Sequence, residues 1–252
     1  MGSSKLPVLP LEHPVIVLPA SRFTLHLSKD LGEALLALIE QSDTLPVVAA
    51  VPITTTSSSG TEPVFSEWGT ATRILRLVRP PARNPRQPYL LSLQGLARVR
   101  LSSPFKLPPP ENRTSMLGPT LATHDIEYPS EERVPSREVV DKFKQSALRL
   151  LDRLARDSVQ QSRRDGYHKI ANMLDDITDA RTPWMADVLV GSINTDYSDK
   201  LGTVCSTAVT YAYYFYQLFL LARTQMLVYP LPARYLQNRH PFPRSPRKSP
   251  LL

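Results

Sequence analysis

The chain has 252 residues, 42% of them hydrophobic, which is enough for one large domain or two small ones with a buried core. Its single cysteine, Cys205, excludes an intrachain disulfide and argues against a cysteine-based metal site. The net charge of +7 does not indicate a nucleic-acid-binding body. Six basic residues and no acid lie in residues 223–252, so the rest of the chain is nearly neutral.

The chain begins with a pattern of short strands around one helix. Residues 5–19, KLPVLPLEHPVIVLP, hold four prolines and predict edge strands and turns, because proline cannot donate to an interior ladder. Residues 23–27 alternate between apolar and polar and predict a strand. An apolar stripe over residues 31–39 predicts a helix, which either Ser28 or Asp30 can cap.

A long hairpin at residues 66–101 organises the rest of the chain. Residues 68–78 are rich in β-branched and aromatic residues, and residues 89–101 alternate with a period of two, which predicts strands. Gly69 and Gly95 interrupt these strands where a bulge or a close backbone approach is expected, and long bent strands of this kind suggest a small closed barrel. The predicted inward row is Tyr89, Leu91, Leu93, Gly95, Ala97, Val99 and Leu101.

Two further strands complete the predicted strand-rich part. The continuous apolar run at residues 45–53 predicts a buried strand, and residues 119–128 predict a last one. Residues 54–63 form a polar loop, and residues 102–118 are rich in proline and irregular. A charged segment bounded by prolines at residues 127–136 then indicates a boundary between subdomains.

Helices follow this boundary. Ser136 is predicted to begin a helix that SRRDG, residues 162–166, interrupts. Thr182 and Pro183 predict an N-cap followed by proline at the first helical position, and a further helix is expected near Asn194 or Thr195. The first helix carries an apolar stripe made of Val139, Val140, Phe143, Ala147, Leu150, Leu151 and Leu154. Strands followed by helices predict the α+β class.

Several of these segments, in this order and spacing, resemble the N-terminal substrate-binding domain of Lon-type ATP-dependent proteases. They are LPVLPLEHPVIVLP, LPVVAAVPI, EWGTATRILRLV, QGLARVRL and DDITDARTPWMADVLVGSINTDYSDKLG, and they span roughly residues 5–202. The resemblance implies a PUA-like β-barrel at 5–130 and a helical subdomain at 135–200. We expect the remaining residues, 201–252, to form an irregular C-terminal tail outside the family. Because the chain starts directly at this domain, it looks more like the peroxisomal than the mitochondrial Lon homologue.

The sequence departs from the rest of that family in its catalytic modules. No G-x-x-x-x-G-K-[ST] phosphate loop occurs in the chain, so we expect no ATP hydrolysis. No nucleophile can be assigned either, so we expect no proteolysis by this chain. Ser146 and Lys144 stand close together, but on a stretch that reads as a structural helix. We assign no catalytic, cofactor-binding or metal-binding residue and no cofactor.

The resemblance stops at Gly202, and the tail that follows admits two interpretations. Residues 201–222 are uncharged and long enough to cross a membrane, yet tyrosines and a glutamine at 211–217 weaken that interpretation, so membrane insertion is not expected. The loss of amphipathic pattern, followed by a proline-rich end without acids, suggests the hypothesis that residues 203–252 derive from a retained intron or a wrong exon join.

For four groups of polar or aromatic residues, an ordinary structural role is a better interpretation than a functional one. The hairpin arginines form a solvated face rather than an RNA site, the histidines lack metal-ligand spacing, and Asp175, Asp176 and Asp179 belong to a helix joint. Trp68 and Trp184 are predicted core anchors rather than peptide-binding contacts. The arginines are Arg73, Arg76, Arg79, Arg83, Arg86, Arg98 and Arg100, and the histidines are His13, His26, His124, His168 and His240.

The resemblance implies non-catalytic recognition of unfolded or damaged polypeptides for ATP-dependent proteolysis. It also implies association with further copies of the chain through the helical subdomain. The alternatives are a ubiquitin-ligase-type adaptor and an RNA-binding PUA-like module, although we expect no nucleic acid partner. The expected compartment is the peroxisomal matrix by resemblance and otherwise the cytoplasm, because no secretion signal is present.

Overall fold

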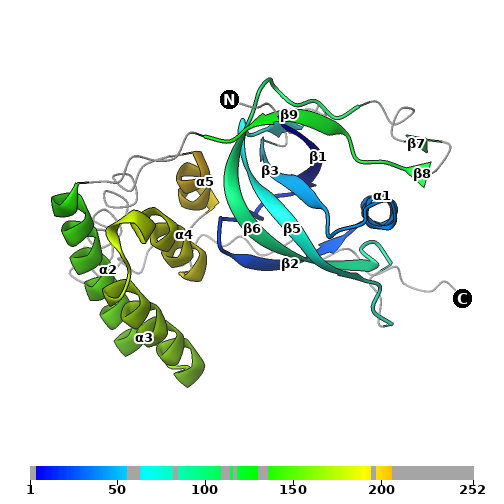
Figure 1. The fold of residues 1–252 in the computed structure, drawn as a ribbon. Coiled ribbons are helices and arrows are strands. Elements are labelled where there is room, and N and C mark those ends of the chain that lie inside the picture. Colours follow the sequence, from blue (N-terminus) through cyan, green and yellow to red (C-terminus); the bar gives the residue numbers. More distant parts are fainter. Residues whose placement is uncertain are drawn as a thin grey trace, which may run out of the picture.

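A strand-rich part and a helical part lie side by side (Figure 1). The computed structural model describes residues 4–55, 63–81, 85–108, 114–115, 118–129, 136–193 and 197–205. The strands are β1 (Ser4–Leu11), β2 (Arg22–Leu27), β3 (Val47–Thr55), β4 (Val64–Phe65), β5 (Trp68–Val78), β6 (Tyr89–Leu101), β7 (Thr114–Ser115), β8 (Gly118–Pro119) and β9 (Thr123–Glu127). The helices are α1 (Lys29–Glu40), α2 (Arg137–Asp157), α3 (Gln161–Asp175), α4 (Thr182–Ser192) and α5 (Tyr197–Cys205), with a 3₁₀ turn η2 (Asp179–Arg181). The predicted α+β class is confirmed.

The β5–β6 hairpin is the centre of the sheet, as the alternating pattern predicts. Six of the seven residues in the predicted inward row of β6 are buried, and Ala97 is half-buried. The row serves two separate parts of the core. Tyr89, Leu91 and Leu93 pack in one apolar cluster, while Val99 and Leu101 pack in another.

Both predicted glycine positions are confirmed as close backbone approaches. A Cβ added to Gly95 would lie 2.1 Å from the carbonyl oxygen of Leu18, and one added to Gly69 would lie 2.6 Å from that of Ala50. The β5–β6 register also shifts beside Gly95, which leaves Leu96 in a bulge with 38% of its surface exposed. The bulge lets one long strand bend and serve both clusters.

The prediction of edge strands for residues 5–19 is wrong for β1, because β1 has two strand partners, one along each half. Its first half is antiparallel to β9, from Ser4 to Pro7, and its second half is parallel to β3, from Val8 to Leu11. Each half of β1 therefore needs ladder bonds on one side only, which accommodates the prolines within it. Successive pairings lead from β1 through β9, β6, β5 and β3 back to β1.

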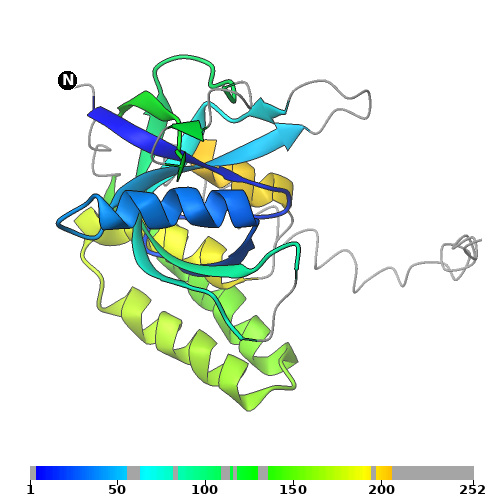
Figure 2. The same ribbon diagram turned by 90° about the vertical axis from the view of Figure 1, so that its right-hand side faces the viewer.

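The helix α1 lies across one side of this sheet (Figure 2). Of the two candidate caps, Ser28 is the N-cap, and its hydroxyl accepts from the backbone N–H of Leu31 at 3.4 Å. Leu35 is fully buried in the cluster that also holds Leu91 and Leu93. The helix thus covers the apolar cluster formed by the first half of β6.

In the helical part the apolar stripe of α2 is confirmed, but the predicted helix boundaries need correction. The interruption lies at residues 158–160, where the backbone of Ser158 and Gln160 is extended, and SRRDG lies inside α3. Gly166 is tolerated there on an exposed helix face. Thr182 is already helical and Arg181 is the N-cap, so Pro183 occupies the second helical position rather than the first.

None of the helices in the described ranges combines the length and the hydropathy needed to span a bilayer. The predictions made for residues 206–252, including most of the uncharged segment, lie outside the described residues.

Candidate functional site

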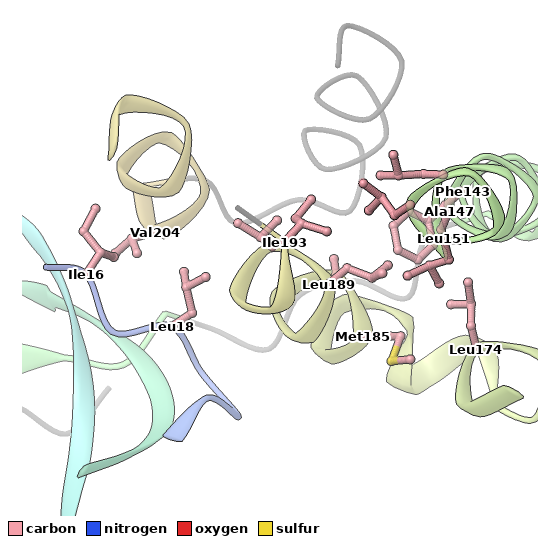
Figure 3. Packing of buried hydrophobic residues seen from close by; sticks show 14 residues of the cluster. Ile16, Leu18, Phe143, Ala147, Leu151, Leu174, Met185, Leu189, Ile193 and Val204 are labelled. Carbon is pink, nitrogen blue, oxygen red and sulfur yellow. The ribbon is translucent and has the colours of Figure 1, made fainter. Parts of the chain in front are cut away.

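A shared apolar cluster joins the helical part to the strand-rich part. Ile16 and Leu18, from the segment between β1 and β2, lie in one buried cluster with residues of α2, α3, α4 and α5 (Figure 3). Trp68 of β5 packs against the same cluster, in agreement with its prediction as a core anchor. The helices are therefore held on the sheet by burial of apolar surface.

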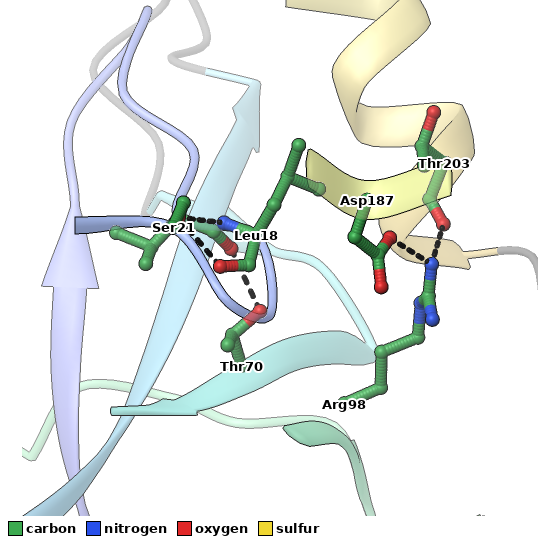
Figure 4. Close-up of polar contacts among 7 residues, drawn as sticks. Leu18, Ser21, Thr70, Arg98, Asp187 and Thr203 are labelled. Carbon is green, nitrogen blue, oxygen red and sulfur yellow. Dashed lines mark hydrogen bonds and ion pairs between the residues drawn. The ribbon is translucent and has the colours of Figure 1, made fainter. Parts of the chain in front are cut away.

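A buried ion pair crosses the same boundary (Figure 4). The guanidinium of Arg98 on β6 lies 2.5 Å from a carboxylate oxygen of Asp187 on α4 and also donates to the carbonyl of Thr203 on α5 at 3.3 Å. The two charged side chains are 13% and 2% exposed, so the prediction that Arg98 belongs to a solvated face is wrong. The sequence feature that points to such a buried pair is Asp187, a single acid within the apolar run WMADVLV.

Polar contacts also secure the segment between β1 and β2, against which α4 packs. The hydroxyl of Ser21 donates to the carbonyl of Leu18 at 2.5 Å, and the hydroxyl of Thr70 donates to the carbonyl of Val17 at 2.7 Å (Figure 4). On the other side, the hydroxyl of Tyr197 in α5 donates to the carbonyl of Ile53 at 2.9 Å. The first two bonds hold the segment that packs against α4, and the third ties α5 to β3.

An open hollow of about 650 Å³ lies among α3, the end of α4 and α5. Its described lining combines two cations, Arg163 and Lys200, with the ring of Tyr167 and the apolar side chain of Ile170. Gly191, Ser192 and Ile193, at the end of α4, also line it. Its size is that of a pocket for a few side chains of a ligand.

Two of the helices that line this hollow, α3 and α4, also carry exposed apolar side chains. Trp184 is 42% exposed, which makes its prediction as a core anchor wrong, and Met173 is 39% exposed. Trp184, Val188 and Gly191 recur every three to four residues, so they share one face of α4, and that face leads to the hollow at Gly191. This surface of α3 and α4, with the hollow, is the candidate functional site.

Three of the described hairpin arginines have specific partners. Arg98 is in the buried ion pair, Arg100 lies 3.6 Å from Glu67 and over the ring of Trp68, and Arg79 lies over the ring of Tyr89. Arg83 lies outside the described residues.

The other candidates have structural surroundings. The ammonium of Lys144 donates to the carbonyl of Ile177 at 2.7 Å and so ties α2 to the α3–α4 connection. Asp175, Asp176 and Asp179 lie at that joint, as predicted. Within the described part of the chain, no three histidine, cysteine or acidic residues are grouped so that they could hold a metal ion.

Solved structures of Lon N-terminal domains share the fold of this chain. The N-terminal domain of the Mycobacterium avium complex Lon protease is similar with a TM-score of 0.59 at 17% identity, over 84% of this chain and 96% of that one. The Lon N-terminal domain protein from Xanthomonas campestris is similar with a TM-score of 0.51 at 13% identity, over 86% and 98%. At these identities the likeness shows the fold alone.

The sequence itself establishes the family. The family model of the ATP-dependent protease La (LON) substrate-binding domain matches residues 5–202, so the chain belongs to this family. The match covers the range over which the sequence segments resemble the family, and it ends at Gly202, as predicted. No curated protein matches the chain.

Proposed function

We propose that this chain is a non-catalytic module that binds unfolded or damaged polypeptides. The observation that carries the proposal is membership of the Lon substrate-binding family, which covers residues 5–202. The surface of α3 and α4 is the binding site in this proposal. Exposed apolar side chains around a hollow suit a ligand whose own apolar residues are not buried.

The described lining of the hollow suggests how such a ligand would be held. Tyr167 and Ile170 can bury an apolar side chain, while Arg163 and Lys200 can pair with an acidic group beside it. The proposal includes the PUA-like barrel implied by the resemblance. The ring of strand pairings through β1 supports the barrel.

Fluorescein-labelled α-lactalbumin provides a direct test, because it can be studied both folded and permanently unfolded. The full chain is expected to bind the reduced, carboxymethylated form and to ignore the native form in fluorescence anisotropy at physiological salt. Equal affinity for both forms, or binding of neither, would overturn the proposal. A single-stranded RNA ligand in the same assay tests the RNA-binding alternative, for which salt-sensitive binding is the signature.

The proposal assigns no catalysis to this chain, since its sequence holds no phosphate loop. Cleavage of a casein substrate or hydrolysis of added ATP by the purified chain would contradict this point. The ubiquitin-ligase adaptor remains an alternative, and stable capture of a folded ligase subunit in place of unfolded protein would favour it.

Two further parts of the proposal concern assembly and compartment. We propose that copies of the chain associate through the helical part, which sedimentation of the full chain at increasing concentration tests. We also propose the peroxisomal matrix as its compartment, with the cytoplasm as the alternative. Imaging of the tagged chain beside a peroxisomal marker distinguishes the two.

A further inference from the structure

The strand β2 is an outer strand of the sheet. It pairs with β6 from Arg22 to Leu27, and among the described strands it has no second partner. Four of its six side chains are exposed, including Phe23 at 37%, and Leu25 is half-buried. One long edge of β2 therefore faces away from the sheet.

The register determines which backbone groups lie on that edge. The N–H of Gly95 donates to the carbonyl of Ser21 at 2.9 Å, so the opposed residues Ser21 and Gly95 are joined by a backbone hydrogen bond. Hydrogen-bonded positions alternate along an antiparallel pair, and the N–H and C=O groups of the next residue, Arg22, thus point away from β6. The same holds for Thr24 and His26. These three residues present donors and acceptors to an incoming strand.

Apart from the charge of Arg22 at its start, this edge lacks several of the features that proteins use to prevent strand addition. β2, with the sequence RFTLHL, contains no proline, no lysine and no register shift against β6. At about 3.3 Å per residue it offers an edge roughly 20 Å long. The strand at the far end of the sheet, β4, is only two residues long and follows Pro63.

The start of β2 also lies beside the candidate binding surface. A Cβ placed on Gly191, which lines the hollow, would lie 3.7 Å from the Cβ of Ser21. Ser21 directly precedes β2. A single extended ligand could thus reach both the hollow and the strand edge.

We propose that the open edge of β2 binds an extended segment of an unfolded polypeptide as an added strand. This inference rests on the proposed function and specifies its ligand as an extended main chain. The backbone groups of Arg22, Thr24 and His26 pair with the ligand backbone, and Phe23 and Leu25 contact its alternate side chains. Recognition of this kind depends on the absence of structure in the ligand more than on its sequence, because every unfolded chain carries the same backbone donors and acceptors.

Proline at an outward position tests the edge with a matched control. Thr24→Pro removes an N–H that faces away from β6 and places a proline ring on the edge, while the ladder to β6 keeps its bonds. Thr24→Val keeps the N–H and removes only the hydroxyl, which lies 3.1 Å from that of Ser92. Thr24→Pro is expected to weaken binding of carboxymethylated α-lactalbumin by on the order of tenfold, and Thr24→Val to leave it unchanged. Equal binding by the two variants would overturn the edge proposal.

A second experiment uses the unaltered protein, so it tests the edge proposal even if Thr24→Pro does not fold. A soluble threonine–valine octapeptide is compared with the same octapeptide N-methylated at alternate residues, which keeps the side chains and removes backbone donors. The unmethylated octapeptide should compete with labelled α-lactalbumin and the methylated one should not. Equal competition by both would contradict strand addition.

The outcomes separate failure of this inference from failure of the proposed function. If the wild-type chain binds no unfolded protein, the proposed function itself fails. If it binds but neither proline nor N-methylation matters, only the edge assignment fails. Concentration-dependent dimerisation that Thr24→Pro abolishes would assign the edge to a second copy of the chain and overturn the inference.

Discussion

At the scale of single residues, two positions connect parts of the molecule that are distant in the sequence. Arg98 joins β6 to α4 and α5 through its bonds to Asp187 and Thr203. Gly95 lets the segment before β2 approach β6 closely enough for backbone hydrogen bonds. Both positions fall on the strand that the alternating pattern predicts, yet neither contact follows from the alternation.

The buried ion pair predicts that loss of the Asp187 charge strongly lowers the stability of the fold. Asp187→Asn keeps the shape of the side chain but leaves the buried guanidinium of Arg98 without its carboxylate, and should lower the free energy of unfolding by about 3–5 kcal/mol in urea titrations. The exposed pair between Arg100 and Glu67 gives the control on the same strand, and Glu67→Gln should change stability by less than about 1 kcal/mol. Equal effects of the two changes would contradict the buried pair.

The two glycines Gly95 and Gly166 predict opposite effects of the same added methyl group. Gly95→Ala forces the backbone near Leu18 to move and should destabilise the fold by roughly 1–3 kcal/mol. At Gly166, inside α3, an added Cβ meets no atom within 4 Å, so Gly166→Ala should stabilise the fold by about 0.5–1 kcal/mol. Thermal and chemical unfolding of both variants tests this, and stabilisation by Gly95→Ala would refute the close approach.

At the scale of elements, amphipathic pattern predicts the elements better than their ends. The stripe of α2 and the alternation of β6 appear as predicted because each element buries one face. Element ends are less predictable, because caps and neighbouring helices decide them. SRRDG continues α3 although glycine is a weak helix former, and the non-helical residues 158–160 separate α2 from α3 instead.

The strand β6 allows a test of which face is inward. Leu93 is fully buried, whereas Leu96 in the bulge is 38% exposed. Leu93→Asp should cost more than about 3 kcal/mol, since a buried leucine contributes about 1.5–3 kcal/mol and the buried charge adds a further penalty. Leu96→Asp should cost less, about 1–2 kcal/mol, because its side chain is only partly buried and the carboxylate can reach solvent. An unchanged melting temperature for Leu93→Asp would show that the inward face is misassigned.

At the scale of the whole molecule, the strand-rich part supports a helical surface that carries the candidate site. The segment between β1 and β2 supplies Ile16 and Leu18 to the helical core, so the helices do not form an independent bundle. The surface of α3 and α4 then faces outward with Trp184 and the hollow. Binding of a ligand is therefore expected to depend on exposed side chains of this surface, which can be substituted without changing the core that holds the helices on the sheet.

Two exposed apolar residues distinguish binding at the α3–α4 surface from non-specific hydrophobic association. Trp184→Ser should weaken binding of carboxymethylated α-lactalbumin about tenfold, or about 1.4 kcal/mol, because the indole is then lost from the contact surface. Val159, 93% exposed in the α2–α3 turn, lies outside that surface, and Val159→Ser should change nothing. Val159→Ser should leave the melting temperature unchanged, whereas Trp184→Ser should lower it somewhat because more than half of the indole is buried, so binding is measured well below both unfolding transitions. An effect of Val159→Ser as large as that of Trp184→Ser would remove the α3–α4 surface as the site.

The sequence by itself determined the α+β order, the inward row of β6, the two glycine positions at which a bulge or a close approach is expected, and the family over residues 5–202. These features depend on periodicity and local residue type, which are visible in one dimension. Only the tertiary structure decided that Arg98 is buried against Asp187, that Trp184 is exposed, and that β1 pairs on both sides. The reason is that burial and pairing depend on which distant element arrives at a residue, and a local pattern carries no information about that neighbour.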